Sequence, residues 1–181
     1  MNPLIKSIIL VAIISAISYP QTLPTGFQQL LNKTHMQYAL PPDFSPTPVI
    51  ANDDVAYDFA IKSKSSLLEI RYRIWPIMTN ESNPIYKAMI LTMGLNISNG
   101  KLPQSQDYPP ESVKQEFGAD AGCTAVVHTD SQFGKGYKFC MISVIHKDNA
   151  GDAYIFYLYN DPQSIVTALT TNKIFHALKF K

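Results

Sequence analysis

Two stretches of the chain alternate apolar and polar residues with a period of two, and this alternation restricts the fold more than any other feature. Such a pattern is typical of β-strands that bury one face. The first stretch predicts a strand over 55–62, a turn over 63–66 and a second strand over 67–75. In the second of these strands one face carries apolar side chains, and the other face carries Glu69, Arg71 and Arg73.

The second stretch predicts three more strands, over 123–128, 137–146 and 153–159, which are joined by short connections rich in Asp, Asn and Gly. Strands joined in this way form hairpins, and three in succession form an antiparallel meander. We therefore expect each of these strands to lie beside its neighbour in sequence.

Helical signals separate and follow the two groups of strands. Asn83 as cap, Pro84 at the first helical position and Asn99-Gly100 as a left-handed stop predict a helix over 84–98, apolar almost all round and hence largely buried. A short helix over 110–117 ends at Gly118, with Val113 and Phe117 on one face. Asp161 and Pro162 begin a last helix, which we expect to continue through Ile174 and Ala177.

The order of strands, helices, strands and helix predicts an α+β fold, in which helices flank a central antiparallel β-sheet as an α/β/α sandwich. We expect residues 1–18 to be a signal peptide, residues 19–47 an irregular lead-in with one short strand over 36–40, and residues 48–181 a single α+β domain. Five prolines interrupt the lead-in and argue against regular structure there.

The first residues predict export from the cytoplasm. Lys6 precedes an apolar run over 8–17, and small residues at Ala16 and Ser18 suit cleavage after Ser18. The run is shorter than the roughly 20 residues that a membrane-spanning helix needs, so we expect no stable span after cleavage. An uncleaved amino-terminal anchor is the alternative. The predicted location is periplasmic or extracellular.

Charge gives no indication of a polyanionic partner. Lys6 is the only charged side chain in the predicted signal peptide, so the rest of the chain has equal numbers of basic and acidic residues. Lys and Arg do not cluster on any segment. Nucleic acid and anionic membrane surfaces are therefore poor candidates, and a protein or small molecule is the expected partner.

Two segments, at the start and the end of the predicted domain, resemble a known family. Tyr38-Ala39-Leu40-Pro41-Pro42-Asp43-Phe44, the strands and buried helix that follow, and Ile174-Phe175-His176-Ala177-Leu178-Lys179-Phe180 are similar to the PsbP-like superfamily. That family includes an extrinsic subunit of the photosynthetic oxygen-evolving complex, a Ran-binding nuclear factor and many exported bacterial proteins. The resemblance implies an α/β/α sandwich and a non-enzymatic accessory or binding module. Phe44 stands where family members often have Trp, and the resemblance transfers no binding residue.

The two cysteines are candidates for a disulfide, since disulfides persist in exported proteins. If the turn between the first two meander strands is centred between Ser131 and Gln132, Cys123 faces Cys140 across the hairpin. Two buried free thiols are the alternative. A catalytic thiol is disfavoured because no histidine occupies an obviously partnered position.

Two His-x-Asp pairs, His128 with Asp130 and His146 with Asp148, carry groups that bind metals or transfer protons. The hairpin register keeps His128 and His146 apart at opposite ends of the strands. Each pair alone is also compatible with a solvated strand end beside a turn. The candidate metal or catalytic site combines His146, Asp148 and Asp120, which lie at the far end of the hairpin.

Other motifs favour structure over chemistry. Asn52-Asp53-Asp54 carries oxygen ligands, but it lacks calcium-loop spacing and suits a turn. Phosphate-binding glycine loops and nucleophile elbows are absent, so no cofactor is expected. The leading hypothesis is an exported, non-enzymatic accessory or binding module. The alternative is a small metal-dependent enzyme or hydrolase with a site around His146, Asp148 and Asp120.

Overall fold

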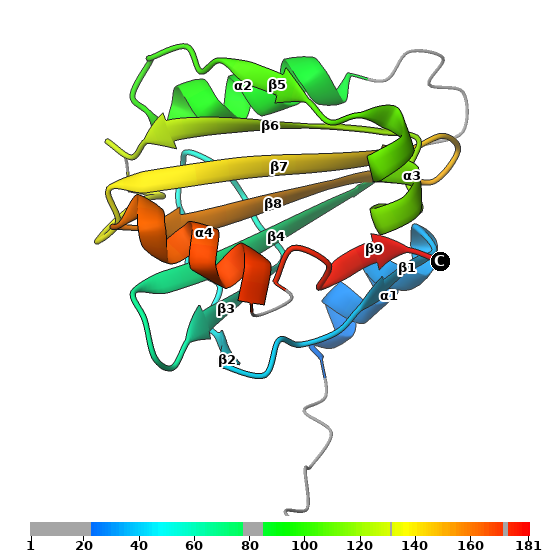
Figure 1. The fold of residues 1–181 in the computed structure, drawn as a ribbon, viewed down its shortest axis with the longest axis horizontal. Helices are drawn as coiled ribbons and strands as arrows, with labels where there is room; N and C mark the ends of the chain where they lie inside the picture. The colour runs from blue at the N-terminus through cyan, green and yellow to red at the C-terminus, as the bar shows by residue number, and fades with distance from the viewer. Residues whose placement is uncertain (1–22, 78–84, 131, 172–173) are drawn as a thin grey trace, which may run out of the picture.

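The computed structural model describes residues 23–77, 85–130, 132–171 and 174–181. They form an α+β fold with a large antiparallel sheet of order β2-β3-β4-β8-β7-β6-β5 and a small antiparallel sheet of β1 and β9 (Figure 1). The predicted fold class is therefore confirmed. The strands are β1 Met36–Tyr38, β2 Phe44–Thr47, β3 Phe59–Ser63, β4 Leu68–Pro76, β5 Ser105–Asp107, β6 Ala121–His128, β7 Phe139–Lys147, β8 Gly151–Tyr159 and β9 Leu178–Phe180. The helices are α1 Thr25–Lys33, α2 Tyr86–Ile97, α3 Pro110–Phe117 and α4 Pro162–Thr171.

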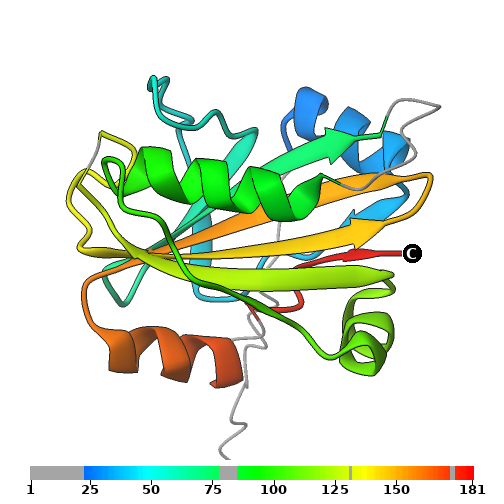
Figure 2. The ribbon, with the colours of Figure 1, turned by 90° about the horizontal axis from the view of Figure 1, so that it is seen from above.

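The large sheet lies between two apolar layers. One face packs against α1, α3, α4 and the small sheet, and the other packs against α2 (Figure 2). All nine residues of β8 are buried because this strand lies between β4 and β7 and is covered on both faces. As expected from its alternation, β4 directs its apolar residues to the first face and Glu69, Arg71 and Arg73 to the α2 face.

The middle helix ends where the sequence predicts but is less buried than expected. Asn99 and Gly100 both have positive φ, and the Gly100 N–H donates to Leu95 O over 2.8 Å, as a left-handed stop requires. Only one face of α2 is buried, because the helix forms an outer layer of the sandwich, and Ile85 just before it is 52% exposed. Asn83 and Pro84 lie outside the described residues, as does the predicted signal peptide.

The short strand predicted over 36–40 is present as β1, but the prediction that the rest of the segment 19–47 is irregular is wrong from Thr25 onward, because α1 and β2 form there. Phe27 and Leu31 lie one helical turn apart and are both buried, and the Phe27 ring stacks on Phe59 with centroids 4.7 Å apart. Pro24 precedes α1, Pro41 and Pro42 lie between β1 and β2, and Pro46 lies in β2, which is tolerated because β2 is the edge strand of the sheet.

The last helix is shorter than predicted. It begins at the predicted cap, where the Asp161 carboxylate accepts the N–H groups of Gln163 and Ser164, but it ends at Thr171. From Ile174 the described chain is not helical, and β9 pairs with β1 through Leu178 opposite Tyr38 and Phe180 opposite Met36. The prediction of helix through Ala177 is wrong because this distant pairing overrides the local pattern.

Two details of the predicted strands also differ. The strand predicted over 55–62 is regular only from Phe59, and the side chains of Val55 and Tyr57 join the α2 face whereas Phe59 and Ile61 join the opposite face. The short exposed strand β5 pairs with the edge of β6 in a segment where no strand is predicted.

Candidate functional site

A polar cavity lies over β4 on the α2 face of the sheet. Helix α2 packs over β6 and β7, and among the residues that the structure describes no helix packs extensively over β4 on this side. Two loops take the place of a helix: the segment before β3 and the connection between β6 and β7. They enclose a cavity of about 850 Å³, which we call the β4 cavity, with a lining that includes Ala51, Asp54, Glu69, Arg71, Asn99, Gln132 and Lys135.

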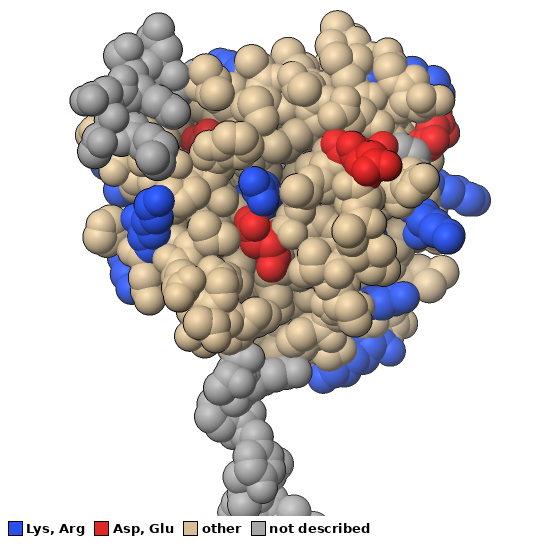
Figure 3. Space-filling model, turned by 180° about the vertical axis from the view of Figure 1, so that it is seen from behind, with Lys and Arg blue, Asp and Glu red and all other residues tan. Residues whose placement is uncertain are grey.

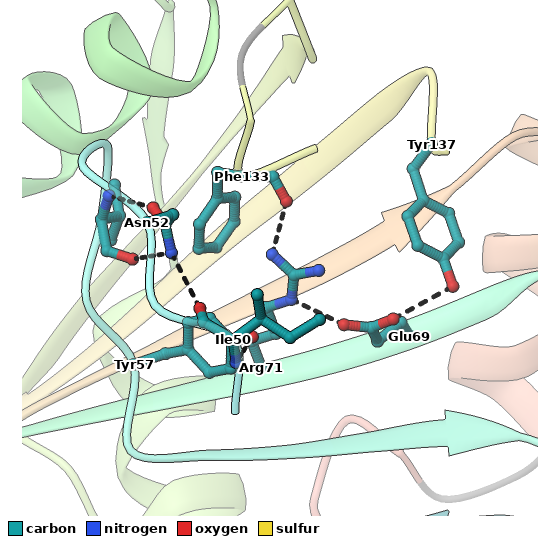
Figure 4. A network of polar contacts seen from close by, with 8 residues as sticks. Ile50, Asn52, Tyr57, Glu69, Arg71, Phe133 and Tyr137 are labelled. Carbon is teal, nitrogen blue, oxygen red and sulfur yellow. Dashed lines mark hydrogen bonds and ion pairs between the residues drawn. The ribbon is translucent and has the colours of Figure 1, made fainter. Parts of the chain in front are cut away.

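Arg71 forms the floor of the β4 cavity and is 6% exposed. Its guanidinium lies 4.9 Å from the centroid of the Tyr57 ring and 4.6 Å from that of the Phe133 ring. Nη1 donates to the Phe133 carbonyl, and Nε donates to Glu69 Oε1 over 2.7 Å (Figure 4). These contacts satisfy the general requirement that a buried charge be paired and hydrogen-bonded, and they fix the plane of the guanidinium.

Glu69 links the floor of the cavity to the β6–β7 connection. Its second oxygen, Oε2, accepts the Tyr137 hydroxyl over 3.3 Å. Burial, and then the adjacent Glu69 carboxylate, raise the pKa of Tyr137 well above its usual value. Tyr137 is therefore a neutral donor at physiological pH, and both oxygens of Glu69 are engaged.

The segment before β3 is held in place by its own turn. The Asn52 side-chain oxygen accepts the N–H groups of Asp54 and Val55, and its amide nitrogen donates to the Ile50 and Val55 carbonyls. Asp54 Oδ2 accepts the Phe133 N–H over 2.8 Å, which ties this segment to the β6–β7 connection. Asn52 and Asp54 thus make turn and bridging contacts, in agreement with the turn interpretation of this motif.

Charge on the α2 face is mixed in sign. Lys and Arg side chains, and Asp and Glu side chains, are scattered with wide uncharged areas between them (Figure 3). At the edge of the β4 cavity, Asp130 forms an ion pair with Lys101, with 2.5 Å between Oδ2 and Nζ. Asp130 was predicted as a partner of His128, but His128 instead packs on the Phe139 ring at 4.7 Å.

The residues of the weak predicted site do come together, at the other end of α2. His146 Nε2 lies 3.1 Å from Asp148 Oδ1, and Asp120 Oδ2 accepts the Asp148 N–H over 2.9 Å. The sequence analysis missed Asp152, which is 5% exposed and lies 2.6 Å from His146 Nδ1 through its Oδ1. Asp152 comes from the adjacent strand and pairs directly with His146 in the sheet register.

Two tyrosines complete the environment of His146. Tyr86 stacks on the imidazole with centroids 5.0 Å apart, and the Tyr154 hydroxyl donates to Asp152 Oδ2 over 3.0 Å. Burial lowers the pKa of His146, but the hydrogen bonds to Asp152 and Asp148 and the charges of both carboxylates raise it, so the net pKa is above its usual value. Below this raised pKa both ring nitrogens carry protons and donate to the two carboxylates, because carboxylate oxygens accept hydrogen bonds. In that state neither nitrogen offers a lone pair to a metal or a substrate.

The two histidines are separated as predicted, but the register used to predict this is wrong. His128 pairs with Phe139 and His146 pairs with Ala121, at opposite ends of the β6–β7 ladder. The hairpin is centred between Phe133 and Gly134, two residues later than expected. Phe133 is fully buried and folds back toward the core, with its ring 5.9 Å from that of Tyr57.

This shift in register separates the cysteines. Cys123 pairs with Val144 and Cys140 pairs with Val127, so the expectation that the two cysteines face each other is wrong. Four positions along the ladder correspond to about 13 Å, beyond the reach of a disulfide. Both thiols are buried and free. Burial, and then the charge of Asp107, raise the pKa of Cys123 to about 11, which disfavours the reactive thiolate.

Among residues 23–77, 85–130, 132–171 and 174–181, no group of three or more His, Cys, Asp or Glu side chains is arranged to hold a metal ion. Within the same part of the chain, no helix is long and apolar enough to cross a membrane. Comparison of the chain with family models, with curated proteins and with solved structures found no match.

Proposed function

We propose that this chain is an exported, non-enzymatic binding module that takes a small polar ligand, or a polar segment of a protein partner, in the β4 cavity. The observation that carries the proposal is the placement of Arg71, a 94%-buried cation, at the floor of a cavity of about 850 Å³. Ligand sites are commonly concavities of roughly 300–1,000 Å³ with a few well-placed polar groups.

The geometry of the other polar cluster supports binding rather than catalysis. A general base needs a free lone pair within reach of a substrate proton, and below the raised pKa of His146 both of its imidazole nitrogens donate to carboxylates. The alternative function, a metal-dependent enzyme or hydrolase around His146, Asp148 and Asp120, requires at least one of these nitrogens to be available. We therefore assign this cluster a structural role.

The resemblance to the PsbP-like superfamily is compatible with this proposal. A central antiparallel sheet with helices on both faces is what the resemblance implies, and its members include non-enzymatic accessory proteins. Export rests on the amino-terminal sequence. Mass spectrometry of the natural protein is expected to find an amino terminus near Tyr19, and intact Met1 on protein recovered from the soluble cytoplasm would contradict export.

The binding proposal is tested by filling the cavity. A defined library of carboxylates, amines, saccharides and nucleosides is screened by thermal shift, and each hit is mapped by NMR amide shifts. Ala51→Trp places a large side chain at the exposed cavity rim and is expected to abolish binding. Ala88→Trp makes the same exchange at an exposed position of α2 outside the cavity lining, and binding should persist. Hits that bind both variants equally would place the ligand elsewhere and refute the proposed site.

A further inference from the structure

We propose that the β4 cavity recognises a carboxylate group, bound through Nη2 of the Arg71 guanidinium and steered by Lys135. This inference rests on the proposed function and specifies the class of ligand. It follows from the polar groups of the lining that internal contacts leave unused.

The carboxylates of the lining are already engaged. Glu69 accepts from Arg71 and Tyr137, and Asp54 accepts the Phe133 N–H. Asp130 pairs with Lys101, first through their hydrogen bond and then through the lysine charge, and this pairing lowers the pKa of Asp130. These acids therefore hold the walls together: Glu69 uses both of its oxygens in protein contacts, and Asp54 and Asp130 each use one.

The cations of the lining are the groups that remain. Within the described part of the chain, no hydrogen bond or ion pair engages Arg71 Nη2 or Lys135 Nζ. In Figure 4 Nη2 of Arg71 points away from the Phe133 carbonyl and from the contact between Nε and Glu69. The exposed side chains of Gln132 and Asn99 add neutral amides to the same cavity. The cavity thus presents two cationic donor groups, Arg71 Nη2 and Lys135 Nζ, that pair with no described residue.

The held geometry of Arg71 suits a carboxylate. Nε and Nη1 each donate to a protein acceptor, which leaves Nη2 as the guanidinium nitrogen that can donate a charge-assisted hydrogen bond to a ligand carboxylate. Contacts with Glu69, Tyr57 and Phe133 fix the guanidinium before the ligand arrives, so binding loses little side-chain entropy.

Two other ligand classes fit less well. Saccharide sites commonly present an aromatic face, but the rings nearest this cavity, Tyr57 and Phe133, are 5% and 0% exposed and lie against Arg71. Doubling the charge of the ligand doubles its attraction to Arg71 and Lys135 and also its repulsion by the more numerous acids Asp54, Glu69 and Asp130. A phosphate dianion therefore has the larger net electrostatic cost, and a singly charged carboxylate has the smaller one.

The test uses butyrate and its neutral analogue butyramide as probes, titrated into the full domain at constant ionic strength and followed by NMR amide shifts. Butyrate is expected to shift cavity amides, including those of Ala51 and Gln132, while butyramide binds at least tenfold more weakly. Lys135→Gln should weaken butyrate binding about threefold, within the range measured for exposed ion pairs. Lys138→Gln, at an exposed lysine outside the lining, is the matched control and should leave the affinity unchanged.

Arg71→Lys keeps the charge but removes the fork, and should weaken butyrate binding by about tenfold or more. If this variant does not fold, Lys135→Gln and the paired probes still decide the question. Equal binding of butyrate and butyramide at the cavity would overturn the carboxylate inference and leave the proposed binding function standing. If neither probe shifts cavity amides and no library compound does so, both the inference and the proposed function fail.

Discussion

Replacing Asp152 with Asn tests the structural role of the His146 cluster through its pH dependence. The change keeps the shape of the side chain but removes the negative charge 2.6 Å from His146 Nδ1, where both residues are at most 5% exposed. Removing one partner of a buried ion pair typically costs about 3–5 kcal/mol. Asn retains an acceptor oxygen, so we expect a loss near the lower end of this range, about 3 kcal/mol at pH 6.

The sign of the pH dependence follows from the raised pKa of His146 in the folded protein, where the hydrogen bonds and charges of Asp152 and Asp148 outweigh burial. A histidine with a raised folded pKa adds stability that is fully present below its unfolded pKa of about 6.5. This stability is lost as pH rises through the folded pKa. The difference between the wild-type protein and Asp152→Asn should therefore be largest near pH 6 and smaller near pH 9.

The measurement is urea unfolding followed by circular dichroism at both pH values. A loss of about 3 kcal/mol corresponds to a melting temperature lower by roughly 6–12 °C for a chain of this size. Asp148→Asn is the matched control, because its side chain is 73% exposed and should cost less than about 1 kcal/mol. An Asp152→Asn loss below about 1 kcal/mol at pH 6, or one that is equal at both pH values, would refute the assignment of His146 as a buried imidazolium.

Three further predictions concern the fold. Denatured protein kept from reductant should show two reactive thiols, because Cys123 and Cys140 are free, and one disulfide would contradict the β6–β7 register. Deleting residues 178–181 removes β9 and exposes its partner strand, so urea unfolding should show a loss of more than about 3 kcal/mol; a chain of unchanged stability would refute the importance of this pairing. Gly118→Ala, at φ +61° with Phe180 O 3.1 Å from the added Cβ, should cost about 1 kcal/mol or more, whereas Gly26→Ala, in open space within α1, should not destabilise.

Much of the fold could be predicted from local signals. The alternation in β4 and in the meander strands reflects burial of a pleated surface, which is present in any short window of sequence. The end of α2 at Asn99-Gly100 and of α3 at Gly118 follows from residues that adopt positive φ at low cost. Asp161 marks the start of α4 because its carboxylate satisfies free helical N–H groups. Each signal acts within a few residues.

The candidate sites were only partly visible in the sequence. Asp120, Asp148 and His146 were grouped correctly, because Asp148 follows His146 by two residues and the β6–β7 hairpin brings the start of β6 beside the end of β7. Asp152 was missed as the main partner because its position opposite His146 depends on the β7–β8 register. Arg71 was placed on the right face of β4, but an alternating charged residue on a strand normally faces solvent, and nothing local indicates its burial.

Only the tertiary structure decided the features that depend on contacts between distant residues. β9 is a strand because Met36–Tyr38 supplies a partner about 140 residues earlier in the chain, at a cost in loop closure that grows slowly with separation. The β6–β7 register differs from the predicted one because Phe133 packs in an apolar site beside Tyr57. In the register that forms, the two cysteines do not face each other. The same packing brought two loops over Arg71 and formed the β4 cavity. The periodicity of residues along a helix or strand determines which of its faces is apolar. Which other element packs on that face depends on contacts between distant parts of the chain.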